Sequence, residues 1–425
     1  MNWPQTVNSW ENNDMSADKT YTEKSINVEQ LALGMYVKAV LKGNGERINN
    51  EGYLLSSRSI ENLRNSGIKE LIVVPEKAKK VEKIDKVFSD ITVVPPSNEK
   101  SLFASQKNSH IPLEQELLTA NKLYQTTKTL QEKIIANIKQ ETQLTLSDIE
   151  PTTDAIVASI FRNQDALSCL SRISNKGSYL MEHSTSVAIL MTIFAKHLAI
   201  EKRVIEQLAL GAFLHDIGKV LLPKELLTSK HPVGEKEQKL LNSHVKLGIN
   251  VLQATPSISH VAVKLVHEHH ERLDGSGFPL GLQGKQIDLY SRMIAIVDSY
   301  DAMVSGRPNK KAMFPINAFK ALIADSPDKF DEELIEKFIQ CIGIYPVGTL
   351  VKLNSGKIGL ISKLNQNKPL HPHVKVFYNA RLNQAVAIEE IDLSRCKYKD
   401  QIDCCIRPNE YNLNLLTFFK MAFGE

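Results

Sequence analysis

The chain has 425 residues, enough for two or three domains, and its 52 basic and 48 acidic residues leave a net charge of +4, which is too weak to indicate a nucleic-acid partner. The longest apolar run, Val187–Ala195, is far shorter than the roughly 20 residues that cross a bilayer, and the polar first residues do not resemble a secretory signal. No two cysteines have the C-x-x-C spacing, so we expect reduced cysteines in a cytoplasmic protein without membrane insertion.

The N-terminal part predicts a small domain between two irregular segments. Residues 1–25 are rich in Asn, Ser, Asp and Thr and show no apolar period, so we expect them to be disordered. Residues 26–90 combine short apolar runs with turn residues and predict a small α+β domain, with a helix at 59–66 and a strand at 71–74. Residues 91–111, with Pro, Ser and Lys, are typical of a linker.

The rest of the chain is mainly helical. Residues 112–150 predict a long connecting helix, whose apolar positions recur at helical spacing between Leu113 and Ile138. Packing within the chain is favoured for this helix, while a homodimer through it stays open. Residues 151–345 continue the helical pattern, and residues 346–425 predict a small β-rich appendage and tail, with a hairpin turn at 354–356. The expected protein is multidomain and mainly α.

Nine of the twelve histidines lie between His183 and His270. Metal-ligand side chains recur there about once per predicted helix, and an antiparallel helical bundle can direct such side chains to one interior point. Four histidines of the region are not counted as candidate ligands. His197, His231 and His260 are interpreted as surface histidines or as histidines whose hydrogen-bonding groups are satisfied, and His267 is interpreted as structural. The candidate ligands are His183, His215, Asp216, His244, His269, His270 and Asp298.

These residue types favour iron, manganese or zinc over calcium, and the lack of thiolates argues against a structural zinc site. Seven donors are too many for one ion, but they suit two ions about 3.5–4 Å apart that share a carboxylate. Asp216 is the natural bridge, because it lies beside a ligand histidine in an apolar stretch. Such a pair serves phosphodiester cleavage. Lys219, one turn later, can face the same cavity, and Arg307 and Lys310 could bind substrate phosphates.

The stretch His267–Pro279, HEHHERLDGSGFP, predicts a helix end followed by a rigid loop, because glycines and a proline follow the paired histidines. Glu271 in this stretch is left open as a ligand, an outer carboxylate or a solvated charge. Asp301 lies one turn after Asp298, where it could orient a ligand imidazole or cap the next element, and a role in orienting the imidazole is favoured.

Three motifs resemble the HD-GYP family, a branch of the HD phosphohydrolase superfamily. They are HDIGK at His215–Lys219, HHERLDGSGFP at His269–Pro279, and SRMIAIVDSYDAMVSGRP at Ser291–Pro308. The resemblance covers about residues 165–340, and the first part of the chain looks like the small domain that often precedes this one. It implies an all-helical HD-type bundle with two or three iron or manganese ions, which hydrolyses cyclic di-GMP to linear pGpG and GMP.

The resemblance also assigns roles by position. The seven candidate ligands match the family's metal ligands, Lys219 matches its active-site lysine, and Arg307 and Lys310 match its phosphate-contacting pair. Gly277 and Phe278 fall in the loop that matches the family's signature loop. Asp216 and Lys219 are therefore the expected catalytic residues.

Two departures from the family pattern stand out. The signature tyrosine is Phe278 here, so its hydroxyl is missing. A glutamate ligand of the three-metal members is Tyr179 here, which predicts two metals, with iron or manganese expected. The leading hypothesis is a cyclic di-GMP phosphodiesterase that uses hydroxide bound at a two-metal site. The alternatives are a phosphodiesterase for another cyclic dinucleotide, such as cyclic GMP-AMP, and a cyclic di-GMP receptor with little turnover that signals to a protein partner.

Overall fold

A computed structural model of the chain describes residues 22–32, 35–41, 47–53, 60, 63–64, 68–75, 111–173, 179–229, 231, 233–307, 310–365, 368–395, 400–411, 413–414 and 418. It forms two compact units, Met1–Asp90 and Ile91–Glu425, which are described one at a time. Most of residues 1–25 and the predicted linker at 91–111 lie outside the described residues. Within the described residues, no helix combines the length and the hydropathy needed to cross a bilayer.

The first unit contains an antiparallel four-stranded sheet with the order β1-β4-β2-β3. The predicted strand at 71–74 is present as β4, whereas the predicted helix at 59–66 lies only partly within the described residues. β1 begins inside the segment that we expect to be disordered, because its backbone pairs with β4. The elements are β1 (Lys24–Asn27), η1 (Val28–Gln30), β2 (Tyr36–Leu41), β3 (Arg47–Tyr53) and β4 (Glu70–Val73).

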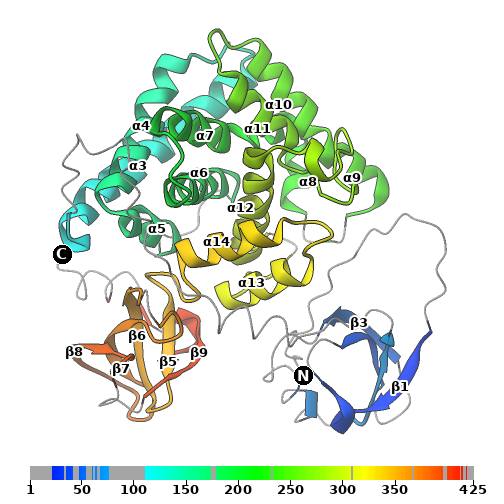
Figure 1. The fold of residues 1–425 in the computed structure, drawn as a ribbon, viewed down its shortest axis with the longest axis vertical. Helices are drawn as coiled ribbons and strands as arrows, with labels where there is room; N and C mark the ends of the chain where they lie inside the picture. The colour runs from blue at the N-terminus through cyan, green and yellow to red at the C-terminus, as the bar shows by residue number, and fades with distance from the viewer. Residues whose placement is uncertain are drawn as a thin grey trace. The chain divides into compact units, whose positions relative to one another are not determined.

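In the second unit, the helix predicted at 112–150 is interrupted, because residues 140–145 are not helical. Its first part is α3 (Leu113–Lys139), which packs against α4, α5 and α6 (Figure 1), and its last residues belong to α4, which begins at Leu146 and crosses the domain boundary expected at 151. The buried apolar side chains of α3 include Leu117, Leu130 and Ile134, which are all covered by other residues of the same chain. Its outer face is polar apart from Leu118, which is 57% exposed. The favoured packing within the chain is therefore observed for this helix.

The helices of this unit surround α6 (Figure 1). Residues 187–195 of α6 are buried on every side, because a helix that is apolar all round must lie inside a bundle. The helices after α3 are α4 (Leu146–Arg162), α5 (Gln164–Ile173), α6 (Tyr179–His197), α7 (Lys202–Leu214), η3 (Ile217–Leu221), α8 (Lys224–Thr228), α9 (Glu235–Asn242), α10 (His244–Gln253), α11 (His260–Glu268), η4 (Gly284–Gln286), α12 (Leu289–Ser305), α13 (Pro315–Ala324) and α14 (Glu332–Ile342).

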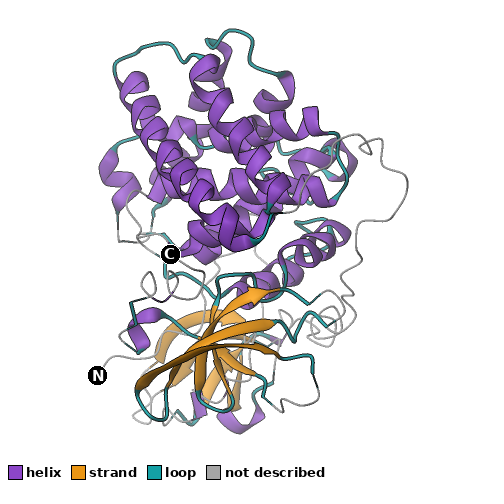
Figure 2. Ribbon diagram, turned by 90° about the vertical axis from the view of Figure 1, so that its left-hand side faces the viewer, coloured by secondary structure: helices purple, strands orange, loops and turns teal. Residues whose placement is uncertain are grey.

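A five-stranded antiparallel sheet with the order β8-β7-β6-β5-β9 follows the helices and lies beside them (Figure 2). The predicted hairpin turn at 354–356 joins β5 to β6. The C-terminal tail adds β9 to this sheet, where it pairs with β5. The Lys375 ammonium of β7 lies 3.1 Å from the Glu114 carboxylate of α3, so the sheet is tied to the helices. The elements are β5 (Leu350–Leu353), β6 (Lys357–Lys363), β7 (His373–Asn379), β8 (Gln384–Asp392), β9 (Ile402–Cys405) and η5 (Pro408–Glu410).

Candidate metal centre

The seven predicted ligands come together, although they come from five different parts of the bundle. Each lies on an element whose position is set by the surrounding core: α6, the end of α7, the start of α10, the end of α11 and α12. Six of the seven are buried, and His270 is partly exposed. They are His183 on α6, His215 and Asp216 after α7, His244 at the start of α10, His269 and His270 after α11, and Asp298 on α12.

Asp216 lies at the centre of the cluster and faces histidines on two sides. Its Oδ2 atom is 3.4 Å from His215 Nε2 and 3.6 Å from His183 Nε2. Its Oδ1 atom is 3.3 Å from His244 Nε2 and 3.8 Å from His269 Nε2. Among the described residues, two groups of donors could each hold an ion, and both groups contain Asp216. Besides Asp216, the first group contains His183 and His215, and the second group contains His244, His269 and His270.

Backbone hydrogen bonds orient three of the imidazoles. The Nδ1 atoms of His215, His244 and His269 each donate to the carbonyl oxygen three residues earlier, over 2.7, 2.6 and 2.7 Å. This hydrogen bond fixes the tautomer, so the Nε2 lone pair of each ring points into the cluster, as in many metal-bound histidines. His215 Nε2 and Asp216 Oδ1 are buried without a hydrogen-bond partner, which fits a site for a cation.

His183 is oriented by a carboxylate instead. Its Nδ1 atom donates to Asp301 Oδ2 over 2.7 Å, and Ser305 donates to the same oxygen over 3.2 Å. Its Nε2 atom lies 2.9 Å from Asp298 Oδ1. Asp301, on α12, therefore orients the imidazole of the candidate ligand His183, as predicted.

The charges around the site favour the metal-binding forms of His244, His269 and Asp216. Burial lowers the pKa of His244 to about 4 and holds that of His269 well below its usual range. Burial would raise the pKa of Asp216, but the Lys219 ammonium and the His215 imidazole outweigh it and hold this pKa well below its usual range. Burial opposes protonation of His215 and His183, yet Asp216 raises the pKa of His215 to about 10, and Asp298 and Asp301 raise that of His183. Neutral imidazoles and ionised carboxylates are the forms that bind metals, so these two imidazoles must lose a proton before they can bind an ion.

Lys219 contacts the cluster directly. It lies in η3, one turn after Asp216, and its Nζ atom donates to Asp216 Oδ2 over 2.6 Å. Its side chain is 16% exposed, so most of it is buried beside the carboxylate. Lys219 thus lies on the same side as Asp216, one helical turn later, as its spacing in the sequence predicts.

Glu271, whose role is open in the sequence, anchors the loop that follows the paired histidines. Its carboxylate accepts from the backbone N–H groups of Leu280 and Leu282, over 2.7 and 2.9 Å, and its side chain is 1% exposed. Both oxygens are thus used by the loop. At Gly277, a side chain would meet the backbone nitrogen of Arg272 at 2.4 Å, so only glycine fits this approach. The loop is held against the end of α11.

The anchored loop places Phe278 against the cluster. Its ring lies 4.5 Å from the His270 ring and 6.3 Å from the His244 ring, between centroids. Its backbone N–H donates to the carbonyl of His270 over 3.3 Å. The phenyl ring therefore forms part of the wall beside two candidate ligands.

Replacing Glu271 with glutamine is expected to loosen the loop without removing a donor from the cluster. Glutamine has one acceptor oxygen instead of two, so one buried N–H of the loop loses its partner, at a cost of about 1–3 kcal/mol. We expect amide exchange across 277–282 to become roughly ten-fold faster, since about 1.4 kcal/mol corresponds to a factor of ten. Exchange detected by mass spectrometry measures this change.

Glu268→Gln is the matched control for this variant, because Glu268 is also buried at the end of α11 but accepts from Ser291 on α12. Its loop exchange should equal that of the unchanged protein. Equal exchange in both variants would show that Glu271 does not anchor the loop.

The predicted phosphate-contacting residues lie beyond the end of α12. Arg307 and Lys310 pair through their backbones, with N–H···O distances of 2.8 and 3.0 Å, and both side chains are exposed. They are not part of the buried cluster. His197, His231, His260 and His267 are also absent from the two donor groups found among the described residues.

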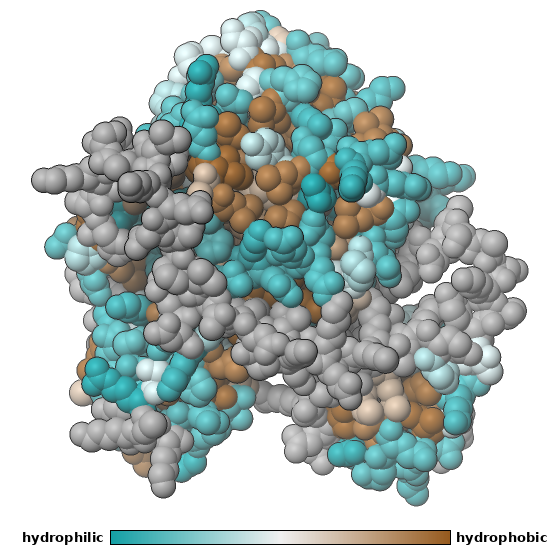
Figure 3. Space-filling model, in the orientation of Figure 1, coloured by the Kyte–Doolittle hydropathy of each residue, from teal (hydrophilic) through white to brown (hydrophobic). Residues whose placement is uncertain are grey.

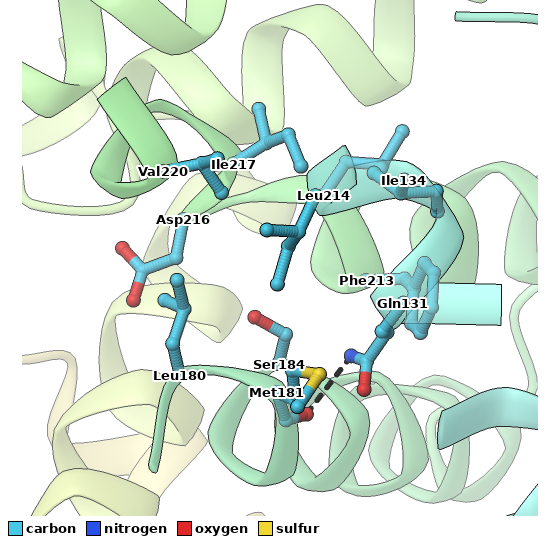
Figure 4. Close-up of a pocket in the computed structure, with 11 residues that line it drawn as sticks. Gln131, Ile134, Leu180, Met181, Ser184, Phe213, Leu214, Asp216, Ile217 and Val220 are labelled. Carbon is cyan, nitrogen blue, oxygen red and sulfur yellow. Dashed lines mark hydrogen bonds between the residues drawn. The ribbon is translucent and has the colours of Figure 1, made fainter. Parts of the chain in front are cut away.

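A pocket adjoins Asp216 on the side of α3 (Figure 4). Its wall is mostly apolar, with Ile134 from α3, Leu180 from α6 and Leu214 from α7. Gln131 of α3 donates to the carbonyl of Met181 over 2.9 Å, two residues before the candidate ligand His183. On the face seen in Figure 3, apolar side chains gather over α6 and α7. The connecting helix thus shares a pocket with the central carboxylate.

Three family models match successive parts of the chain. A domain of unknown function (DUF3391) matches residues 23–149, an HD domain matches residues 168–334, and a KOW domain associated with the HD domain matches residues 350–414. The HD-domain match spans all seven candidate ligands.

Curated proteins that are similar to this chain are named as phosphodiesterases of cyclic dinucleotides. The cyclic di-GMP phosphodiesterase PA4108 of Pseudomonas aeruginosa is 31% identical over 89% of this chain and 91% of its own length. A cyclic di-GMP phosphodiesterase of Thermotoga maritima is 29% identical over 43% of this chain and 49% of its own. The 3'3'-cGAMP-specific phosphodiesterase 1 of Vibrio cholerae is 38% identical over 33% of this chain and 32% of its own.

The likeness to the Pseudomonas protein extends over nearly the whole of both chains, and the HD-domain match covers the cluster of histidines and aspartates. The motifs HDIGK and HHERLDGSGFP lie at this cluster, in the places that the resemblance implies. The chain therefore belongs to the HD-GYP branch of the HD-domain family.

Proposed function

We propose that this protein is a metal-dependent phosphodiesterase that hydrolyses cyclic di-GMP to pGpG, GMP or both. The observation that carries this proposal is the buried Asp216 carboxylate, shared by two groups of donors whose imidazoles are oriented by hydrogen bonds. The substrate class is supported by the names of the relatives, including the one that is similar over nearly its whole length.

We propose that the cluster holds two divalent ions, with iron or manganese favoured. His183 and His215 would bind one, His244, His269 and His270 the other, and Asp216 would bridge them, with Asp298 beside both. When bound, such ions supply a hydroxide at neutral pH and stabilise the charge of the phosphoryl oxygens. The side chain of Tyr179, which replaces a third-metal ligand of the family, lies outside the described residues.

The protein's own residues bind and orient the dinucleotide in this proposal. Lys219, 2.6 Å from Asp216, keeps the bridging carboxylate ionised and presents a positive charge at the edge of the cluster. Arg307 and Lys310 would contact the phosphates as charged donors. Gly277 lets the loop lie close to the end of α11, and Phe278 would pack against the substrate beside His270.

A cyclic GMP-AMP phosphodiesterase is the second candidate. Relatives of this chain include two 3'3'-cGAMP-specific phosphodiesterases of Vibrio cholerae. Phe278 lacks the hydroxyl of the family tyrosine, so a hydrogen bond that could help to select a base is missing at this wall.

The test is to purify the protein without chelator, measure its metal content and incubate it with cyclic di-GMP or 3'3'-cGAMP in the presence of ferrous iron or manganese. Chromatography should detect pGpG or GMP, and competition between the two dinucleotides should identify the preferred one. Binding of cyclic di-GMP without product would contradict the phosphodiesterase and favour the receptor alternative. A protein that holds no metal would contradict the metal site itself.

A further inference from the structure

The segment that carries Arg307 and Lys310 returns on itself between α12 and α13. The N–H of Met313 donates to the carbonyl of Met303, near the end of α12, over 2.8 Å. Within the segment that this hydrogen bond closes, Arg307 and Lys310 pair with each other through their backbones. The side chains of Arg307, Lys310 and Lys311 are exposed, so the segment presents three cations on a short turn. We call the described residues of this segment, 306–307 and 310–313, the cationic turn.

The C-terminal sheet contacts the base of the cationic turn. Phe314, which directly follows the turn and caps α13, packs against the apolar core of this sheet, next to Tyr345. Arg407, two residues after β9, donates from its Nη2 atom to the carbonyl of Ala312. The Arg407 guanidinium also lies 5.5 Å from the centre of the Phe314 ring. Two independent contacts thus link the sheet to one end of the turn.

We propose that the C-terminal sheet positions the cationic turn, and that Arg407 is the positioning residue through which it does so. This inference rests on the proposed function, because it takes Arg307 and Lys310 to be the residues that contact the phosphates. A turn held at both ends loses less freedom when a phosphate binds, so the phosphate binds more tightly. One end of the turn continues from α12, which ends at Ser305, and the other end is held to α12 by the Met313–Met303 hydrogen bond and to the sheet at Ala312 and Phe314.

The test compares Arg407→Ala with Arg381→Ala in the full chain. Arg381 is the matched control, because it lies in the turn between β7 and β8 of the same sheet and also donates to a backbone carbonyl, that of Asn354 in the turn between β5 and β6. We expect Arg407→Ala to raise KM for cyclic di-GMP about five-fold, which is the size of effect seen when two contacting residues depend on each other. The kcat and the metal content should stay nearly unchanged. Arg381→Ala should leave KM unchanged, and Arg407→Lys, which keeps a donor, should lie between the two.

A double-mutant cycle with Arg307→Ala separates positioning from direct contact. If Arg407 acts through the turn, Arg407→Ala should raise KM less in the Arg307→Ala background than in the unchanged protein, because only Lys310 is then left to be positioned. Suppose that Arg307→Ala raises KM. The inference is then overturned if the effects of the two substitutions are additive, or if Arg407→Ala alone leaves KM unchanged. An unchanged KM in Arg307→Ala would instead overturn the phosphate contact in the proposed function, and the inference with it. If turnover is too slow to measure, calorimetric binding of cyclic di-GMP to the same variants replaces KM.

Discussion

Replacing Asp216 with alanine is expected to lower kcat for cyclic di-GMP by roughly a thousand-fold or more and to empty much of the metal site. The carboxylate is 1% exposed and lies within 3.8 Å of four imidazole nitrogens, so its loss leaves both donor groups incomplete. It also removes the partner of Lys219, whose ammonium would then face the remaining imidazoles. Product formation and elemental analysis of the purified variant measure the two effects.

Thermal unfolding gives a readout of this variant that does not depend on activity. A ligand that binds only the folded state stabilises it by about 4 kcal/mol at a thousand times its Kd. Saturating manganese should therefore raise the Tm of the unchanged protein and leave that of Asp216→Ala nearly unchanged. Asp148→Ala, at a partly exposed ion pair with Lys133, is the control and should behave like the unchanged protein. Full metal content in Asp216→Ala would show that this carboxylate is not a shared ligand.

Replacing Gly218 with alanine is expected to destabilise the protein by about 3 kcal/mol and to displace His244. Gly218 lies in η3, two residues after Asp216, against the start of α10. An added Cβ would be 1.9 Å from the carbonyl oxygen of His244 and 2.5 Å from the backbone nitrogen of Gly248. Backbone atoms cannot rotate away as a side chain can, so α10 must move as a unit. Urea unfolding measures the loss of stability, and metal content reports the position of His244.

Gly248→Ala, on the other side of the same contact, should have the opposite effect. Its Cβ would meet the nitrogen of Gly218 at 3.4 Å and Ile217 Cγ2 at 3.5 Å, which are ordinary contacts. Gly248 also lies inside α10, where alanine is favoured over glycine by up to about 1 kcal/mol. Equal stability changes in the two variants would show that the close approach of η3 to α10 does not set the position of His244.

Much of this protein could be predicted from local patterns. The apolar spacing of α3 and the turn before β6 are visible in a few neighbouring residues, because helix and hairpin geometry repeat over short distances. The paired histidines were expected at a helix end, and α11 does end at Glu268, immediately before His269. Their recurrence with other donors, about once per helix, indicated one shared site before any packing was known.

Other features depended on contacts between distant parts of the chain. Asp301 orients His183, which lies 118 residues earlier, and spacing alone could not separate this role from a helix cap. Glu271 could have been a ligand, and only the folded loop shows that both of its oxygens accept backbone N–H groups. β9 was not recognised in the tail, because a short strand becomes evident only when its partner, β5, is in place.

The candidate donors and the mainly helical bundle can be predicted from the sequence, since residue type limits which metals can bind and apolar periodicity indicates which face of a helix is buried. Which oxygen of Asp216 faces which imidazole, and the contact between Arg407 and the cationic turn, depend on the folded chain. Hydrogen bonds and metal donors act over about 3 Å, whereas Ala312 and Arg407 are 95 residues apart and meet only because the bundle and the sheet pack together.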